Sequence, residues 1–460
     1  MKRNGLSDTY YAVRERLELR AKSPYTYVRP DEQILAKEHE ESEKLENPPL
    51  ITIVMPAYNP PQDYFCKAIE SVIAQSYPFW KLVISDSSDN DIAAEIVRSY
   101  EKDDRIVYLR SKEAHGISEN TNAGLRAALG MDRDYIGFMD HDDELTPDAL
   151  FRMAKAIKDS KDGAPKVLYS DEDKMAEEEP SEEQSNETTS PAGTSSPSGQ
   201  EPSSRIYFDP HRKYDFNYDL LLNNNYVCHL MLVRKDMMSR VSFRPEYDGA
   251  QDYDLILQIV RLLCMEDKVR KVELAGHIVH VPKILYHWRS HRGSTATNTQ
   301  SKSYAYEAGL NALHDHVKRM YGRDIAVSHS KHLGFYEIDW YGNRRKTDGR
   351  PVDDYRSFFE KRQDIGAVIG RVIDEHGMMK GVIADKTGNR LYVGINCHFA
   401  GEYNRFDCSQ DVYLADIHYA TLRPELKDLQ AQSEDSMALA EELHARGYMI
   451  LYDPDYARKA

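Results

Sequence analysis

The sequence predicts an α/β protein built on a doubly wound, mostly parallel sheet, followed by a smaller, degenerate α+β region at the C-terminus. Between Pro49 and Tyr169, short apolar runs of strand length alternate with segments of helical spacing. The runs are apolar throughout, as expected of parallel strands that helices cover on both faces. With 460 residues and 41% apolar content, the chain is globular and large enough for more than one domain.

The predicted elements follow in order along this segment. The β-branched run 51–55 predicts the first strand, and the apolar residues of 65–73 then recur at helical spacing. Further strands are expected at 81–84, 106–109, 135–139 and 167–169, with helices at 92–100, 120–129 and 148–157. A less regular block follows, in which we expect a helix from Asp252 to about Leu263 and a strand that ends at Arg289.

Three aspartates lie in the sequence Asp140-His141-Asp142-Asp143, directly after the predicted strand 135–139. Carboxylates that crowd at the end of a strand repel each other, and a divalent cation bound to a nucleotide diphosphate is the commonest reason for such a group. The alternative is a polar turn before the next helix, because Asp is common there too. Asp86 also follows a strand, so Asp86 and Asp140 are expected to face one crevice at the carboxyl ends of the strands.

Composition and charge exclude several classes of protein. The net charge of −16 argues against nucleic-acid binding. No apolar stretch approaches the length of a transmembrane helix, no signal-peptide core follows Met1, and five scattered cysteines favour reduced, cytosolic thiols. The segment 176–204 holds seven Glu and no Lys, Arg or aromatic residue, which predicts a disordered acidic insert; an interaction or phosphorylation segment is the alternative.

Several motifs together resemble the family-2 glycosyltransferases of the GT-A fold, in particular those of bacterial polysaccharide, rhamnan and O-antigen assembly. In chain order these are Pro56-Ala57-Tyr58-Asn59, Asp86, Gly116-Ile117-Ser118 with Asn122, the aspartates of 140–143, and the segments 169–174, 249–255, 285–289 and 293–296. Each motif alone is weak, whereas together, in the family's order, they are a strong signal.

The resemblance implies an inverting, metal-dependent transfer of a sugar from a nucleotide-diphosphate sugar, such as a UDP- or dTDP-sugar, to a hydroxyl of a glycan acceptor. It implies Asp252 as the base that takes the acceptor proton. The implied metal, Mg²⁺ or Mn²⁺, would be held by Asp142, Asp143 and His287. The residues alone leave an N-cap role open for Asp252 and a structural role for His287. The implied binding residues for the nucleotide sugar are Pro56, Tyr58, Asn59, Asp86, Gly116, Ser118, Asn122 and Asp140.

The predicted organisation has four parts: a charged helical extension (1–48), the transferase domain (49–325), a linker (326–362) and a C-terminal region (363–460). That last region resembles the second half of another, truncated family-2 domain, through residues 365–370 and 446–454. Its donor-binding half is missing, and Met437 replaces an acidic residue of the family pattern. Asp435 is therefore expected to cap the helix 436–446, and the region to be non-catalytic and to pack on the first domain or on another protein.

Two other interpretations come from different classes. A nucleotidyltransferase would carry a glycine-rich loop after the first strand, but no glycine follows it here. A catalytically inactive scaffold that pairs with an active transferase is the main alternative, disfavoured because the first domain keeps its complete acidic set. The resembling proteins extend lipid-linked glycans for the cell surface and cell wall, which implies a cytoplasmic protein at the inner face of the cell membrane and a peripheral association with it.

Overall fold

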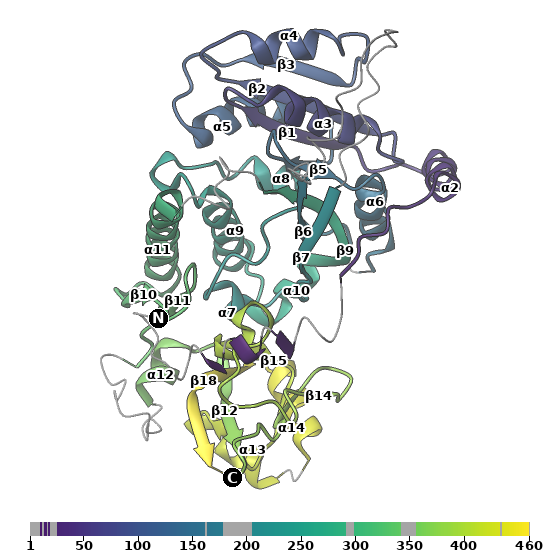
Figure 1. Cartoon of the computed structure of the whole chain (residues 1–460). Coiled ribbons are helices and arrows are strands. Elements are labelled where there is room, and N and C mark those ends of the chain that lie inside the picture. The colour runs from purple at the N-terminus through teal and green to yellow at the C-terminus, as the bar shows by residue number, and fades with distance from the viewer. Residues whose placement is uncertain are drawn as a thin grey trace, which may run out of the picture.

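The computed structural model of the chain (Figure 1) describes residues 10–11, 13–15, 17–18, 25–161, 163–177, 205–290, 299–341, 356–432 and 435–459. A large sheet with its helices fills the upper part of Figure 1, and two small sheets of the C-terminal region lie below it. Most of the predicted acidic insert, residues 178–204, lies outside the described residues.

The main sheet has nine strands within the described part of the chain, in the order β3-β2-β1-β4-β8-β6-β9-β5, with β7 paired to β6. The strands β3, β2, β1 and β4 run parallel, while β8 joins β4 and β6 antiparallel. The predicted doubly wound, mostly parallel sheet is thus confirmed. The strand bounds are β1 (Ile51–Ala57), β2 (Trp80–Asp86), β3 (Ile106–Arg110), β4 (Tyr135–Phe138), β5 (Glu144–Leu145), β6 (Val167–Glu177), β7 (Arg205–His211), β8 (Met231–Arg234) and β9 (Ile278–Arg289).

Helices cover both faces of this sheet. In β1, Ile53 and Met55 contribute to one apolar core and Val54 to the other, because successive side chains of a strand point to opposite faces. The first core contains residues of α3 (Gln62–Ile73), α4 (Ile92–Arg98) and α6 (Ala149–Asp159). The second contains residues of α5 (Ile117–Leu129), α7 (Tyr218–Leu221), α8 (Lys235–Met238), α9 (Gln251–Arg261), α10 (Leu274–His277) and α11 (Thr299–Tyr321).

Several elements differ from their predicted bounds. The helix α5 begins at Ile117 and not at residue 120, because Gly116 adopts a φ of 91° and the Ser118 amide donates to Asp248. The strand β6 continues to Glu177, well past residue 169, because β7 and β9 flank its second half. The helix α9 ends at Arg261, after which a π-turn spans residues 262–266.

The C-terminal region holds a four-stranded sheet in the order β15-β18-β12-β17 and a three-stranded sheet in the order β14-β13-β16. Asp435 caps α14 as predicted, since its carboxylate accepts the Met437 amide at 2.8 Å. The element bounds are α12 (Arg356–Lys361), α13 (Lys427–Gln432), α14 (Ser436–Ala445), β12 (Ile365–Ile373), β13 (Ile383–Ala384), β14 (Arg390–Leu391), β15 (Gln410–Val412), β16 (Leu414–Ala415), β17 (Thr421–Leu422) and β18 (Met449–Lys459).

The C-terminal region packs directly on the first domain, residues 49–325. The predicted linker contains the hairpin of β10 (Val327–His329) and β11 (Tyr336–Ile338), and its aromatic residue Trp340 belongs to the second core. That core continues without a break into β12 and β18. At the junction, the fully buried Arg362 guanidinium donates to the Asp219 carboxylate at 2.7 Å and to Asp364 at 2.9 Å.

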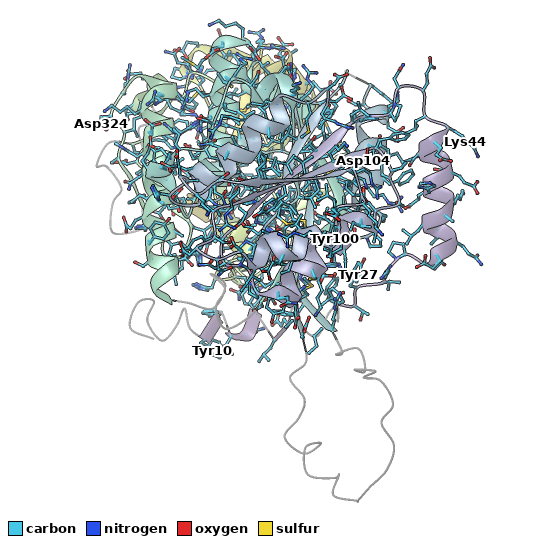
Figure 2. All side chains as sticks on the ribbon, turned by 90° about the horizontal axis from the view of Figure 1, so that it is seen from above. Tyr10, Tyr27, Lys44, Tyr100, Asp104 and Asp324 are labelled. Carbon is cyan, nitrogen blue, oxygen red and sulfur yellow. The ribbon has the colours of Figure 1, made fainter. Side chains whose placement is uncertain are left out.

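The N-terminal extension contacts both parts of the protein, and Figure 2 shows its residues Tyr10 and Lys44 at the periphery. Its carboxylate at Glu15 accepts the Ala400 and Gly401 amides of the C-terminal region. Its helix α2 (Glu32–Glu43) is tied to the first domain by an ion pair of 2.7 Å between Glu38 and Arg152. None of the described helices is both long and apolar enough to span a bilayer.

Candidate active site

Asp86 ends strand β2 and is completely buried. One carboxylate oxygen accepts the Ser88 amide at 2.8 Å. The other accepts the Tyr108 hydroxyl at 2.5 Å and an Arg110 guanidinium N–H at 2.6 Å. Arg110 also donates to two backbone carbonyls of the loop after β2, so it ties that loop to Asp86. A nucleobase that bonds to Asp86 has to displace Arg110 or Tyr108 from it.

The end of β1 and the loop after it hold three of the predicted donor-binding residues. Pro56 lies in β1, and its carbonyl accepts a hydrogen bond from His141 Nδ1 at 3.1 Å, which links this strand to the aspartates after β4. The Tyr58 hydroxyl donates to Asp89 at 2.7 Å, yet the ring remains 55% exposed. Asn59 accepts the Asp89 amide and has a left-handed φ of 43°. These contacts place Tyr58 and Asn59 beside the loop that follows Asp86, the last residue of β2.

The start of α5 holds three further residues that were predicted to bind the donor: Gly116, Ser118 and Asn122. Their contacts are with the segment 243–248. Gly116 has a φ of 91°, in the left-handed region that favours glycine, and an added Cβ would lie 2.5 Å from Asp248 Oδ2. The Ser118 amide donates to Asp248 at 3.3 Å. The Asn122 side chain bonds the backbone N–H and C=O of Phe243, so both ends of its amide are used within the protein. In this structure Ser118 and Asn122 join α5 to the segment before α9.

The residues 140–143, called the aspartate loop below, are held by two residues of β9. The Tyr286 hydroxyl donates to one Asp143 oxygen and accepts the Asp140 amide. The Arg289 amide donates to the other Asp143 oxygen at 2.8 Å, and its guanidinium donates to the Asp142 carbonyl at 2.7 Å. Asp143 is nearly fully buried and is thus engaged on both oxygens, whereas Asp140 and Asp142 are partly exposed.

The aspartate loop brings three carboxylates together, one of them buried and two of them partly buried. Burial raises the pKa of Asp140; the neighbouring Asp142 adds to this rise, and His229 offsets part of it. Burial also raises the pKa of Asp143, again with a contribution from Asp142. A divalent cation would stabilise these carboxylates in their charged form, and hard oxygen ligands suit Mg²⁺ or Mn²⁺. The donor set of this loop therefore fits the predicted metal.

His287 is not brought to the aspartate loop. It follows Tyr286 in β9, so its side chain points to the other face of the strand. There its Nδ1 lies 2.5 Å from an Asp173 carboxylate oxygen, and its ring packs between Tyr27 and Tyr207. His287 is buried there, and the imidazoles that act electrostatically on Asp140 are His229 and His141.

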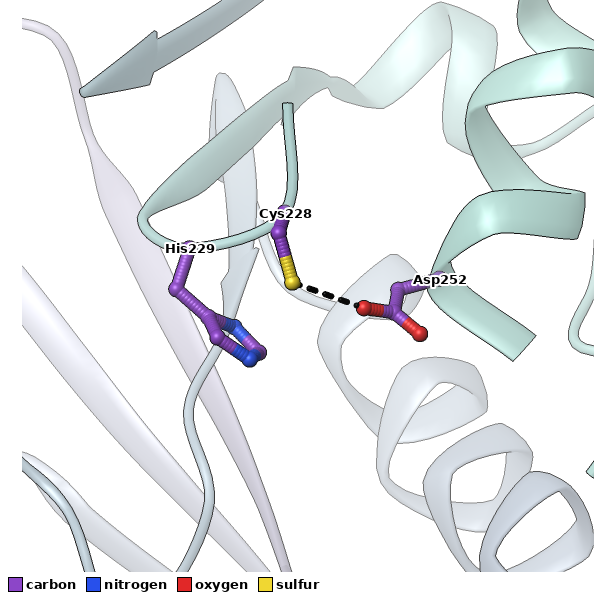
Figure 3. A group of neighbouring side chains, drawn as sticks. All are labelled: Cys228, His229 and Asp252. Atoms are coloured by element: carbon purple, nitrogen blue, oxygen red, sulfur yellow. Dashed lines mark hydrogen bonds between the residues drawn. The ribbon is translucent and has the colours of Figure 1, made fainter. Parts of the chain in front are cut away.

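Asp252 lies in the first turn of α9, where Ala250 is the N-cap, so Asp252 does not cap the helix. One of its carboxylate oxygens accepts the Cys228 thiol at 3.0 Å and the Asn225 amide at 3.4 Å (Figure 3). Its charge acts on Asp140, so the two carboxylates are close enough to interact. A half-buried carboxylate in this position can accept a proton from a bound hydroxyl.

Sequence reasoning assigned no role to several residues that organise this site. Tyr286 and Arg289 stood within a recognised motif, but only their contacts show that they hold the aspartate loop. Asn120 bonds Ser85 and the Ala57 carbonyl, and so joins α5 to the ends of β1 and β2. No local pattern marks Asn120, because its partners are distant in sequence.

Comparison with known proteins shows what part of this chain is similar to. Residues 52–241 match the model of glycosyl transferase family 2. The chain is 35% identical over 287 residues to the uncharacterized protein y4gI of Sinorhizobium fredii, which covers 62% of this chain and 27% of that protein. It is 28% identical over 279 residues to the O-antigen biosynthesis protein RfbC of Myxococcus xanthus, covering 60% of this chain and 18% of that one. The chain thus spans about a fifth to a quarter of these relatives' length.

Among solved structures, the Staphylococcus aureus TarS fragment 1–349 in complex with UDP-GlcNAc matches 58% of this chain and 66% of its own, with 14% identity and a TM-score of 0.38. A TM-score of 0.38 is too low to support the fold. The GT-A fold is therefore assigned from the family match and the observed strand order.

Proposed function

We propose that this chain, whose residues 52–241 form a family-2 glycosyltransferase domain, moves a sugar from a nucleotide-diphosphate sugar to a hydroxyl of a glycan acceptor with inversion at the anomeric carbon. The observation that carries this is the arrangement of three acidic groups around one crevice. Asp86 ends β2 and the aspartate loop follows β4, and both strands pair with β1. Asp252 lies in the first turn of α9, and its charge acts on Asp140. The inversion is tested by NMR, which identifies the anomeric configuration of the product.

In this proposal the donor lies across the ends of β2, β1 and β4. These ends span roughly 10 Å, since neighbouring strands are about 4.8 Å apart. Asp86 bonds the nucleobase once Arg110 moves, and the exposed Tyr58 ring lies beside it. The diphosphate lies toward the aspartate loop.

The metal would be held mainly by Asp142 and Asp140, the partly exposed carboxylates of the aspartate loop. Asp143, which the sequence also suggested as a ligand, is better suited to hold the loop, because its oxygens already accept Tyr286 and Arg289. When bound, Mg²⁺ or Mn²⁺ would neutralise charge on the leaving nucleotide diphosphate. Asp252 takes the proton from the acceptor hydroxyl as the new glycosidic bond forms.

Removal of divalent cations with EDTA is expected to abolish hydrolysis of the donor sugar and to weaken donor binding, because the diphosphate then meets uncompensated carboxylates. Added Mn²⁺ or Mg²⁺ should restore both. The measurement is nucleotide release and calorimetric affinity before and after chelation. Undiminished turnover in EDTA would remove the metal from the mechanism.

The variant Asp86→Asn is expected to raise the Kd for the donor about tenfold to a hundredfold, the effect of losing one hydrogen bond to a charged group. Calorimetry measures this, and urea unfolding checks the fold. The matched control is Asp103→Asn, which breaks an ion pair with Arg105 elsewhere in the domain and should leave the Kd unchanged. Equal effects of both variants would mean that Asp86 acts only through the fold.

We further propose that the acceptor belongs to a cell-surface polysaccharide, which the name of the Myxococcus relative supports. Work on a lipid-linked glycan would require peripheral association with the membrane's cytoplasmic face. Sedimentation with washed membranes tests this, and complete recovery in the supernatant would count against it.

A further inference from the structure

Three metal-ligating side chains of different chemistry meet between the loop before β8 and the first turn of α9. Cys228 and His229 lie in the loop before β8, and Asp252 lies in the first turn of α9 (Figure 3). One ligand atom from each, a sulfur, an imidazole nitrogen and a carboxylate oxygen, lies within 4.8 Å of the other two. The thiol of Cys228 points at Asp252, at 3.0 Å.

This set of ligands differs from that of the aspartate loop. Mg²⁺ and Mn²⁺ prefer oxygen ligands, whereas thiolate and imidazole suit borderline and soft cations such as Zn²⁺ and Co²⁺. Three protein ligands of this kind leave one tetrahedral position open, as in zinc sites that bind water or a small ligand. All three residues are partly exposed, so an ion can reach them.

The surrounding contacts hold the three ligands in place. The Lys213 ammonium, which is fully buried, donates to the carbonyls of Val227 and His229 and so fixes the backbone of the loop. Asn225 bonds both the Asp252 carboxylate and the Cys228 amide.

The His229 ring is fixed by stacking and not by hydrogen bonds. It lies flat against Tyr286, with ring centroids 4.6 Å apart and an interplanar angle of 16°. Within the described part of the chain, neither of its nitrogens has a hydrogen-bond partner. The imidazole is thus oriented by Tyr286, and a ring nitrogen is available to an ion.

We propose that Cys228, His229 and Asp252 form a second cation site, selective for Zn²⁺-like ions over Mg²⁺ and Mn²⁺. On binding, the Cys228 proton passes to solvent, and the thiolate and the Asp252 carboxylate exchange their mutual hydrogen bond for bonds to the ion. No group is oxidised or reduced. If Asp252 is the base of the proposed transfer, the ion occupies that base and inhibits the enzyme; this consequence rests on the proposed function, whereas the binding does not.

The test is a Co²⁺ titration of the full chain, followed by absorption spectroscopy. A thiolate bound to Co²⁺ gives a near-ultraviolet charge-transfer band, which oxygen ligands at the aspartate loop cannot give. The band is expected at one equivalent of Co²⁺ and should disappear when Zn²⁺ is added. It should be lost in Cys228→Ser and weakened in His229→Gln, and kept in the control Cys397→Ser, whose thiol is half-buried in the C-terminal region.

Absence of the band in the wild-type chain, or its survival in Cys228→Ser, would overturn the proposal. Circular dichroism of each variant separates a lost site from a lost fold, and His229→Gln provides a second variant if Cys228→Ser does not fold. Donor binding with Mn²⁺ is measured on the wild-type chain in parallel. A cobalt band without any donor binding would refute the proposed transferase and leave the second cation site intact.

Discussion

Replacement of Asp252 by Asn is expected to lower sugar transfer about 10²- to 10⁴-fold, the usual contribution of a general base. Donor affinity should stay unchanged, because Asp252 lies in α9 and outside the loops that follow β1 and β2. Asn has nearly the same size and can still accept the Cys228 thiol, so the local fold should be kept. Turnover gives the first quantity and calorimetry with the donor gives the second.

The matched control is Asp267→Asn, which removes a carboxylate of the same domain that pairs with Arg240 near the surface. Its turnover should equal that of the wild type. Wild-type turnover in Asp252→Asn would remove Asp252 from the mechanism. Loss of donor binding together with turnover would instead assign Asp252 to the donor site.

Replacement of Arg362 by Met is expected to lower the free energy of unfolding by about 3–5 kcal/mol, the cost of leaving buried charges without their partner. Arg362 is fully buried and donates to two carboxylates, Asp219 of α7 and Asp364 before β12. Methionine fills a similar volume, so the loss reports mainly on the unpaired aspartates. Urea unfolding measures it, and one transition is expected because a continuous core joins the transferase domain to the C-terminal region.

The control for this variant is Arg446→Met, which breaks an exposed pair with Glu442 one helical turn away. Such pairs contribute about 0.3–0.5 kcal/mol. A change below about 1 kcal/mol in Arg362→Met would show that water reaches Asp219 and Asp364, since exposed pairs contribute no more than that. The C-terminal region would then be only loosely docked.

The sequence was sufficient for the parts of the fold that depend on local pattern. Apolar runs of strand length and helical spacing placed the strands β1 to β4 and the helices between them, and Asp86 and Asp140 were expected at strand ends. The cap of α14 by Asp435 also followed from local chemistry. In each case the deciding residues lie within a few positions of one another.

Features that depend on distant partners were not predictable. The motif that ends β9 was recognised, but a motif does not tell which face of the strand His287 occupies, and its partner Asp173 lies 114 residues away. The aspartate loop is likewise held by Arg289, 146 residues from Asp143. The junction of Arg362 with Asp219 joins positions 143 residues apart, and nothing near either residue indicates it.

The central claim is that one crevice binds a nucleotide-diphosphate sugar with a divalent metal and turns it over. Calorimetry of the full chain with a panel of UDP-, dTDP- and GDP-sugars plus Mn²⁺, followed by an assay of donor hydrolysis, tests it most directly. At least one donor should bind in the presence of Mn²⁺, lose its affinity on chelation, and be hydrolysed slowly when no acceptor is present. Binding of no donor in the panel would contradict the claim and favour an inactive scaffold that partners another transferase.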